Sequence, residues 1–104
     1  MRNLDPEQFQ ALIARADAVL LDVRLPEEIE IAALPGAVNI PLAELGARMS
    51  ELNPEAPIAV LCHHGVRSEM AGRLLERNGF ADVSHLTGGI DVWSRVIDTR
   101  IPRY

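Results

Sequence analysis

Apolar residues occur along this chain in two patterns, short continuous runs and longer stretches with apolar positions three or four residues apart. Continuous runs bounded by turn residues are typical of buried strands, and they predict strands at 19–23, 38–40, 58–61 and 82–86. The spaced pattern predicts amphipathic helices. The first helix is expected from Asp5 through Ala16, and a second, short and acidic, begins at 25–28. A third runs from Pro41 through Met49, and a fourth follows the segment 62–68 and ends at Asn78-Gly79. The fifth contains Ile90, Trp93 and Val96.

The alternation of strands with helices predicts an α/β fold with a central parallel sheet and helices on both faces. The segment 58–61 is apolar at every position, as expected of a central strand that is covered on both sides. Ligands of such sheets bind at the carboxyl ends of the strands. Cys62 follows this strand directly, so the predicted architecture places it where a ligand would bind.

Three local patterns predict how individual helices begin, end and pair charges. Asp5-Pro6-Glu7-Gln8 is typical of a helix start, with Asp5 as N-cap and Gln8 completing a capping box. Gly79 suits a left-handed position after a helix, with Phe80 reaching back to Leu75 in a Schellman motif. Glu69 and Arg73, four residues apart, are expected to form an ion pair on one helix face. Residues 98–104 show no clear pattern.

Length and charge limit the classes of protein to which the chain can belong. Its 104 residues fit a single domain spanning 1–104, and its net charge is −5. The acidic excess lies in residues 1–52, where nine acidic residues face four arginines. An acidic protein is poorly suited to nonspecific nucleic-acid binding, so we expect no nucleic-acid partner. The chain has no lysine, which excludes a Schiff-base mechanism.

The presence of one cysteine excludes an internal disulfide, a CxxC redox pair and a multi-thiolate metal site. Cys62, His63 and His64 are poor candidates for a shared metal because adjacent residues rarely bind one ion, so we expect no metal and no other cofactor. No segment resembles a signal peptide or is long enough to cross a bilayer. We therefore expect a cytoplasmic protein with a free thiol and no membrane association. The sequence does not indicate an oligomeric state.

The segment Cys62-His63-His64-Gly65-Val66-Arg67-Ser68 combines a thiol with groups that bind anions. A thiol at a strand-to-helix turn faces free backbone N–H groups and the positive end of a helix dipole, an environment that favours thiolate. Gly65 permits a positive φ or a close backbone approach. Arg67 offers a permanently charged fork for an oxyanion, and Ser68 can donate to sulfur or cap the helix.

A simpler interpretation of each loop residue also exists. A free cysteine is often only a small buried hydrophobe, but the flanking polar and charged residues disfavour that interpretation for Cys62. His63 and His64 add donors, and positive charge at acid pH, but each is also consistent with an ordinary surface position in a loop.

Four motifs in order resemble the rhodanese family, and the likeness covers nearly the whole chain. The loop from Cys62 to Ser68 is similar to that family's Cys-x-x-Gly-x-Arg-Ser active-site loop. Upstream, residues 21–24 resemble its Asp-Val-Arg motif, followed by Glu28 and by residues 34–41. Downstream, residues 79–80 and 86–90 with Trp93 resemble its closing signature.

The resemblance implies sulfur transfer by a two-step mechanism without a cofactor. Cys62 would attack the sulfane sulfur of thiosulfate or a related anionic donor, and its persulfide would pass sulfur to cyanide, a thiol or a partner protein. Substrate-binding residues implied by the resemblance are His63, His64, Gly65, Val66, Arg67, Ser68 and Arg24. Asp22 and Trp93 are expected to be structural, and so are Gly88 and Gly89.

Alternative functions share the same thiol. One is a persulfide carrier or sulfur-relay module that serves a partner protein and has low activity on thiosulfate. A non-catalytic interaction module is another, although the chain retains the reactive loop residues. A third is a cysteine phosphatase, but phosphatase loops have five residues between Cys and Arg, whereas this loop has four.

Overall fold

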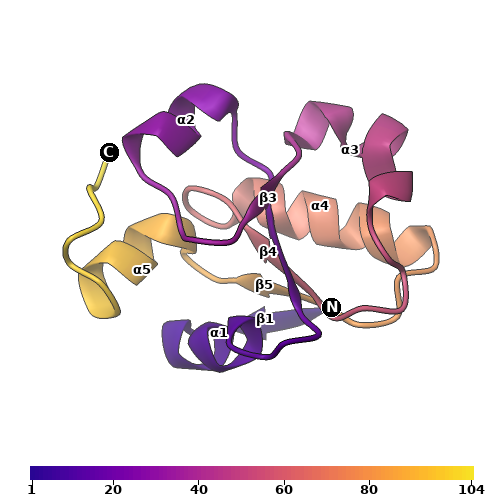
Figure 1. Cartoon of the computed structure of the whole chain (residues 1–104), viewed down its shortest axis with the longest axis horizontal. Coiled ribbons are helices and arrows are strands. Elements are labelled where there is room, and N and C mark those ends of the chain that lie inside the picture. Colours follow the sequence, from indigo (N-terminus) through magenta and orange to yellow (C-terminus); the bar gives the residue numbers. More distant parts are fainter.

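A five-stranded parallel sheet in the order β1-β5-β4-β2-β3 organises the computed structural model, which describes residues 1–104 (Figure 1). The central strand is β4, as the apolar run at 58–61 predicts. The predicted α/β class with a parallel sheet is therefore confirmed. The strands are β1 (Arg2–Leu4), β2 (Val19–Asp22), β3 (Val38–Asn39), β4 (Ile58–Leu61) and β5 (Val83–Leu86).

Helices cover both faces of the sheet, as predicted, and Figure 1 shows α4 and α1 on opposite sides of the strands. On one side α1 and α5 contribute apolar residues to a core with one set of strand side chains. On the other side α3 and α4 pack on the opposite set. The helices are α1 (Pro6–Ile13), α2 (Pro26–Ile31), α3 (Leu42–Arg48), α4 (Val66–Arg77) and α5 (Gly89–Val96), with a 3₁₀ turn, η1, at Met49–Glu51.

The pleat of β4 distributes its side chains between the two cores. Ile58 and Val60 belong to the core under α3 and α4, whereas Ala59 and Leu61 belong to the core with α1 and α5. This is the two-residue period of a strand buried on both faces. Cys62 continues the Ile58–Val60 set, so its side chain lies on the α4 side and is 1% exposed.

The three local predictions are confirmed. Asp5 accepts a hydrogen bond from the Gln8 backbone N–H, and the Gln8 side chain accepts one from the Asp5 N–H, which completes the capping box. At the end of α4, the Phe80 N–H donates to the Leu75 carbonyl, with Gly79 at φ +90°. This is the Schellman geometry. Arg73 Nη2 lies 2.8 Å from Glu69 Oε1, which is the expected ion pair.

The structure differs from the predicted elements mainly at short or terminal segments. The apolar pattern does not predict β1, because Arg2 and Asn3 are exposed and this edge strand has no apolar run. α1 ends at Ile13 and does not reach Ala16, and the helix expected from Pro41 begins at Leu42 and gives way to η1 at Met49. No helix of the structure has the length and apolar character needed to span a membrane.

Candidate functional site

Cys62 lies at the carboxyl end of β4, where the chain turns sharply into α4. Gly65 makes this turn with φ +105°, a left-handed conformation that glycine adopts without steric cost. Its backbone N–H donates to Cys62 Sγ at 3.0 Å. α4 begins at the next residue, so the sulfur lies at the positive end of a helix of 12 residues. The predicted strand–thiol–helix arrangement is therefore present.

The first residues of α5 hold the backbone of the thiol loop. The Ile90 N–H donates to the Cys62 carbonyl at 2.8 Å, and the Asp91 N–H donates to the His63 carbonyl at 3.2 Å. Gly89 makes this contact possible, because a Cβ on it would lie 2.3 Å from the His63 carbonyl oxygen. Gly88 and Gly89, which are predicted to shape a turn, lie at the start of α5, and Gly89 also determines how closely α5 approaches the loop.

A line of hydrogen bonds leads from the sulfur into the protein. Ser68 Oγ lies 3.4 Å from Cys62 Sγ and 3.1 Å from the Gly65 carbonyl oxygen. The same Oγ is 2.8 Å from His85 Nδ1, and His85 Nε2 is 3.0 Å from Asn3 Oδ1. His85 and Asn3 are not among the residues that the sequence predicts for the site. The only signal for His85 is a polar residue within an otherwise buried strand, and Asn3, in the short exposed strand β1, gives none.

Arg67 does not point freely into solvent but is paired with Glu28 of α2. Its two terminal nitrogens lie 2.6 and 2.9 Å from the two oxygens of the Glu28 carboxylate. Chiefly through this hydrogen bonding to Arg67, the pKa of Glu28 falls to about 2. The guanidinium beside the thiol loop is therefore permanently charged and already occupied by a carboxylate of the same chain.

Tyr104 covers part of the thiol loop. Its ring stacks on His63 with 3.8 Å between ring centroids and 6° between planes, and its hydroxyl donates to Glu28 at 2.6 Å. Burial, followed by this bond, raises the pKa of Tyr104 to about 12, so the phenol stays protonated. Burial also lowers the pKa of His63. The His64 ring lies against the His63 ring in a tilted arrangement, with 3.8 Å between centroids and 31° between planes. Positive charge on His63 is thus confined to acid pH.

The remaining predicted site residues are Arg24 and Val66. Val66 is 69% exposed at the start of α4. Arg24 is fully buried, and all five of its N–H donors are used within the protein. Their acceptors are both Asp22 oxygens, the carbonyls of Glu28 and Ala32, and the Tyr104 hydroxyl. Asp22 thus has the structural position expected, and a substrate contact by Arg24 stays a prediction that would require these bonds to break.

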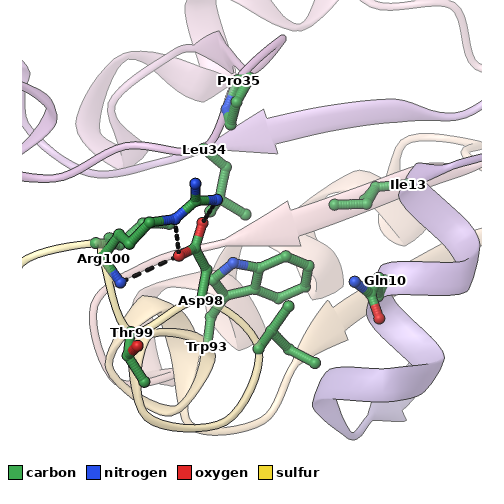
Figure 2. Close-up of a pocket in the computed structure, with 10 residues that line it drawn as sticks. Gln10, Ile13, Leu34, Pro35, Trp93, Asp98, Thr99 and Arg100 are labelled. Atoms are coloured by element: carbon green, nitrogen blue, oxygen red, sulfur yellow. Dashed lines mark hydrogen bonds and ion pairs between the residues drawn. The ribbon is translucent and has the colours of Figure 1, made fainter.

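A separate hollow of about 470 Å³ lies away from the thiol, between α1, the loop at Leu34 and Pro35, and the segment after α5 (Figure 2). Figure 2 shows the Trp93 indole inside it, next to the ion pair of Asp98 and Arg100. None of the predicted site residues lines this hollow. The candidate site is therefore the thiol loop and not this hollow.

Comparison with known proteins identifies relatives in several organisms. The chain is 35% identical over 92 residues to a thiosulfate sulfurtransferase, GlpE, of Pseudomonas syringae, covering 88% of this chain and 86% of that protein. It is 45% identical over 75 residues to a putative sulfur carrier protein, YrkF, of Bacillus subtilis, covering 72% of this chain. The chain spans only 40% of the length of YrkF. A third relative is a chloroplastic rhodanese-like/PpiC domain-containing protein of Arabidopsis thaliana, which is 45% identical over 92 residues and of which the chain spans 31%.

Solved structures share the fold. A rhodanese-related protein from Thermoplasma volcanium superposes with a TM-score of 0.83 at 29% identity, covering 91% of this chain and 92% of that one. The reduced CoADR-RHD protein of Bacillus anthracis superposes with a TM-score of 0.88 at 29% identity, covering 97% of this chain and 18% of that one. A family model described as the rhodanese-like domain matches residues 5–96. The chain therefore belongs to the rhodanese-like domain family.

Proposed function

We propose that this protein is a sulfurtransferase that carries sulfane sulfur as a persulfide on Cys62. The observation that carries this proposal is the Gly65 N–H donating to Cys62 Sγ at 3.0 Å, at the N-terminus of α4. A backbone donor and a helix terminus both favour an anionic sulfur at this position. Relatives named as sulfurtransferases support the same chemistry.

In the first half-reaction the Cys62 thiolate attacks the outer sulfur of a donor such as thiosulfate. The new S–S bond forms as the donor's own S–S bond breaks, and sulfite leaves with the bonding electron pair. The N–H groups of the first turn of α4 have no partner within the helix and are available to the anionic persulfide. Preorganised donors of this kind stabilise charge without reorganisation, so the step needs no metal or organic cofactor.

In the second half-reaction a nucleophile takes the outer sulfur and restores the Cys62 thiolate. The chain has no other cysteine, so no thiol of the same chain can resolve the persulfide. We propose that the acceptor is an external thiol or a partner protein, for which cyanide substitutes in an assay. The site residues are those of the loop from Cys62 to Ser68, with Arg67 attracting the anionic donor.

A sulfur carrier that receives its sulfur from a protein is the second candidate function. One observation favours it, namely the occupation of Arg67 by Glu28. This pairing disfavours capture of a free anion from solution. A relative named as a putative sulfur carrier is consistent with this role, which differs from the first in donor and not in chemistry.

Intact-mass spectrometry tests the proposal directly. Incubation with thiosulfate should add the mass of one sulfur atom, cyanide should remove it with release of thiocyanate, and Cys62→Ser should abolish the gain. If thiosulfate fails but a persulfidated protein donor loads Cys62, the carrier function is the correct one. If no sulfane donor adds mass, sulfur transfer is wrong.

A further inference from the structure

Cys62, Ser68, His85 and Asn3 form one hydrogen-bonded line that crosses three elements of the fold. Parallel pairing sets Val60 opposite His85, and His85 opposite Asn3, so these side chains lie on the same face of the sheet. Cys62, two residues beyond Val60, shares that face. Ser68 reaches it from the first turn of α4 and lies within hydrogen-bonding range of both Cys62 Sγ and His85 Nδ1.

The direction of each hydrogen bond follows from the Asn3 end. Asn3 Oδ1 is an acceptor, so His85 Nε2 carries the proton and donates to it. In the neutral ring Nδ1 is then an acceptor. The Ser68 hydroxyl has two acceptors in range, the Gly65 carbonyl oxygen at 3.1 Å and His85 Nδ1 at 2.8 Å, and we assign its proton to the nearer one, Nδ1. That leaves Ser68 Oγ free to accept the Cys62 S–H. All three bonds therefore run in one direction, from the Cys62 thiol through Ser68 and His85 to Asn3.

His85 is 4% exposed, and its surroundings keep it neutral near neutral pH. Burial lowers the pKa of His85, which leaves Nδ1 unprotonated. Two charged residues of α4 act on it in opposite senses, the Glu69 carboxylate raising and the Arg73 guanidinium lowering its pKa. A surface hollow lies beside His85, and the titratable side chains that line it with His85 are Glu69 and His64. A neutral acceptor thus stands at the end of the line.

We propose that His85 is a positioning residue that receives the Cys62 thiol proton through Ser68. In this step the thiol proton passes to Ser68 Oγ while the original Ser68 hydroxyl proton passes to His85 Nδ1. The products are a Cys62 thiolate that accepts from Ser68 and an imidazolium that donates to Ser68 and to Asn3 Oδ1. No atom is gained or lost, and each hydrogen bond except the last reverses its direction.

A hollow of about 270 Å³ connects this line with the surface. His85 and Asn3 line it together with Glu69 of α4 and His64 of the thiol loop. The imidazolium formed on His85 therefore faces this hollow, while Cys62 stays enclosed on the other side of Ser68. As long as His85 holds the proton, its positive charge stabilises the Cys62 thiolate. The relay rests on the proposed function for its purpose, because it produces the thiolate that sulfur transfer uses.

The experiment measures alkylation of Cys62 by iodoacetamide as a function of pH, which requires no sulfur donor. His85→Asn is the key variant, because an amide oxygen can replace Nδ1 as acceptor for Ser68 but cannot take up a proton. We expect the midpoint of alkylation to lie about one pH unit higher than in the wild type, a loss of about tenfold in rate near neutral pH. Ser68→Ala should show the same shift, and the double variant no more than Ser68→Ala.

Ser84→Ala is the matched control, because Ser84 is a fully buried β5 residue next to His85 whose hydroxyl has no hydrogen-bond partner. It should alkylate like the wild type. A wild-type profile for His85→Asn, or additive shifts in the double variant, would overturn the relay whether or not Cys62 accepts sulfur. If His85→Asn does not fold, nitrogen NMR of the wild-type imidazole decides, since the proposal requires an unprotonated Nδ1 at neutral pH.

Discussion

Glu28 binds Arg67 through both carboxylate oxygens, at 2.6 and 2.9 Å, and so occupies the guanidinium that an anionic sulfur donor would need. Bidentate pairs of this kind are among the stronger charge-assisted hydrogen bonds in proteins. Tyr104 adds a third hydrogen bond to the same carboxylate. Glu28 therefore stabilises the position of Arg67 and at the same time repels incoming anions.

Replacing Glu28 by Gln should improve the use of a free anionic donor. The amide retains a hydrogen bond to Arg67 but removes a negative charge, and about 1 kcal/mol of repulsion corresponds to a KM for thiosulfate about fivefold lower. Steady-state release of thiocyanate measures this. Glu27→Gln, at the exposed neighbouring position, should leave KM unchanged. A higher KM for Glu28→Gln would mean that Glu28 assists donor binding.

Glu28 should also make stability depend on acid pH. Its pKa in the folded protein is about 2, below the ordinary value of 4.5, so ionised Glu28 stabilises the fold above about pH 5 and this contribution is lost as pH falls toward 2. The wild type should therefore lose its stability advantage over Glu28→Gln across that interval. Urea unfolding of both proteins at a series of pH values measures the difference, and a constant difference would contradict the ion pair.

Replacing each of the two arginines of the predicted site, Arg24 and Arg67, should have a different effect. Arg24→Ala leaves the fully buried Asp22 carboxylate unpaired, which costs about 3–5 kcal/mol in the free energy of unfolding. Arg67→Ala should preserve stability better, because Glu28 retains the Tyr104 bond, but should weaken sulfur loading far more than Arg95→Ala does. Urea unfolding and mass spectrometry distinguish these outcomes. If Arg24→Ala is stable but Cys62 cannot be loaded with sulfur, Arg24 is a substrate-binding residue.

The sequence predicts the parts of this fold that depend on local pattern. The apolar runs give β2 and β4 because both strands are buried, and the caps of α1 and α4 follow from short motifs around Asp5 and Gly79. β1 could not be found in this way, because it has only three residues and is defined by pairing with β5. Its Asn3 therefore has no detectable role until the sheet brings it beside His85.

Long-range pairing also explains what the sequence could not predict about the site. The motif around Cys62 predicts a thiol and an arginine in one loop, but not that Arg67 turns to a carboxylate 39 residues earlier. Tyr104 lies in a segment without any periodic pattern, yet its ring covers His63. Such contacts depend on how α2 and the last residues pack together, and no local spacing encodes them.

Tyr104 should control how large a reagent can reach Cys62. Removing the ring in Tyr104→Ala uncovers the face of His63, so alkylation by a bulky maleimide should accelerate more than alkylation by iodoacetamide. Tyr104→Phe retains the stacked ring and loses only the hydrogen bonds to Glu28 and Arg24, so it should leave this selectivity close to that of the wild type. Equal acceleration by both reagents in Tyr104→Ala would show that the ring does not limit access.

Gly89 should be the glycine on which the thiol loop most depends. A Cβ there would lie 2.3 Å from the His63 carbonyl oxygen, and φ is +62°, so Gly89→Ala must push α5 away from the loop. Left-handed strain and overpacking together cost about 3 kcal/mol. Gly79→Ala is the control, with φ +90° and open space around its Cβ, and should cost only about 1 kcal/mol. Thermal unfolding measures both. Sulfur loading should fall only in Gly89→Ala, because α5 then no longer holds the carbonyls of Cys62 and His63.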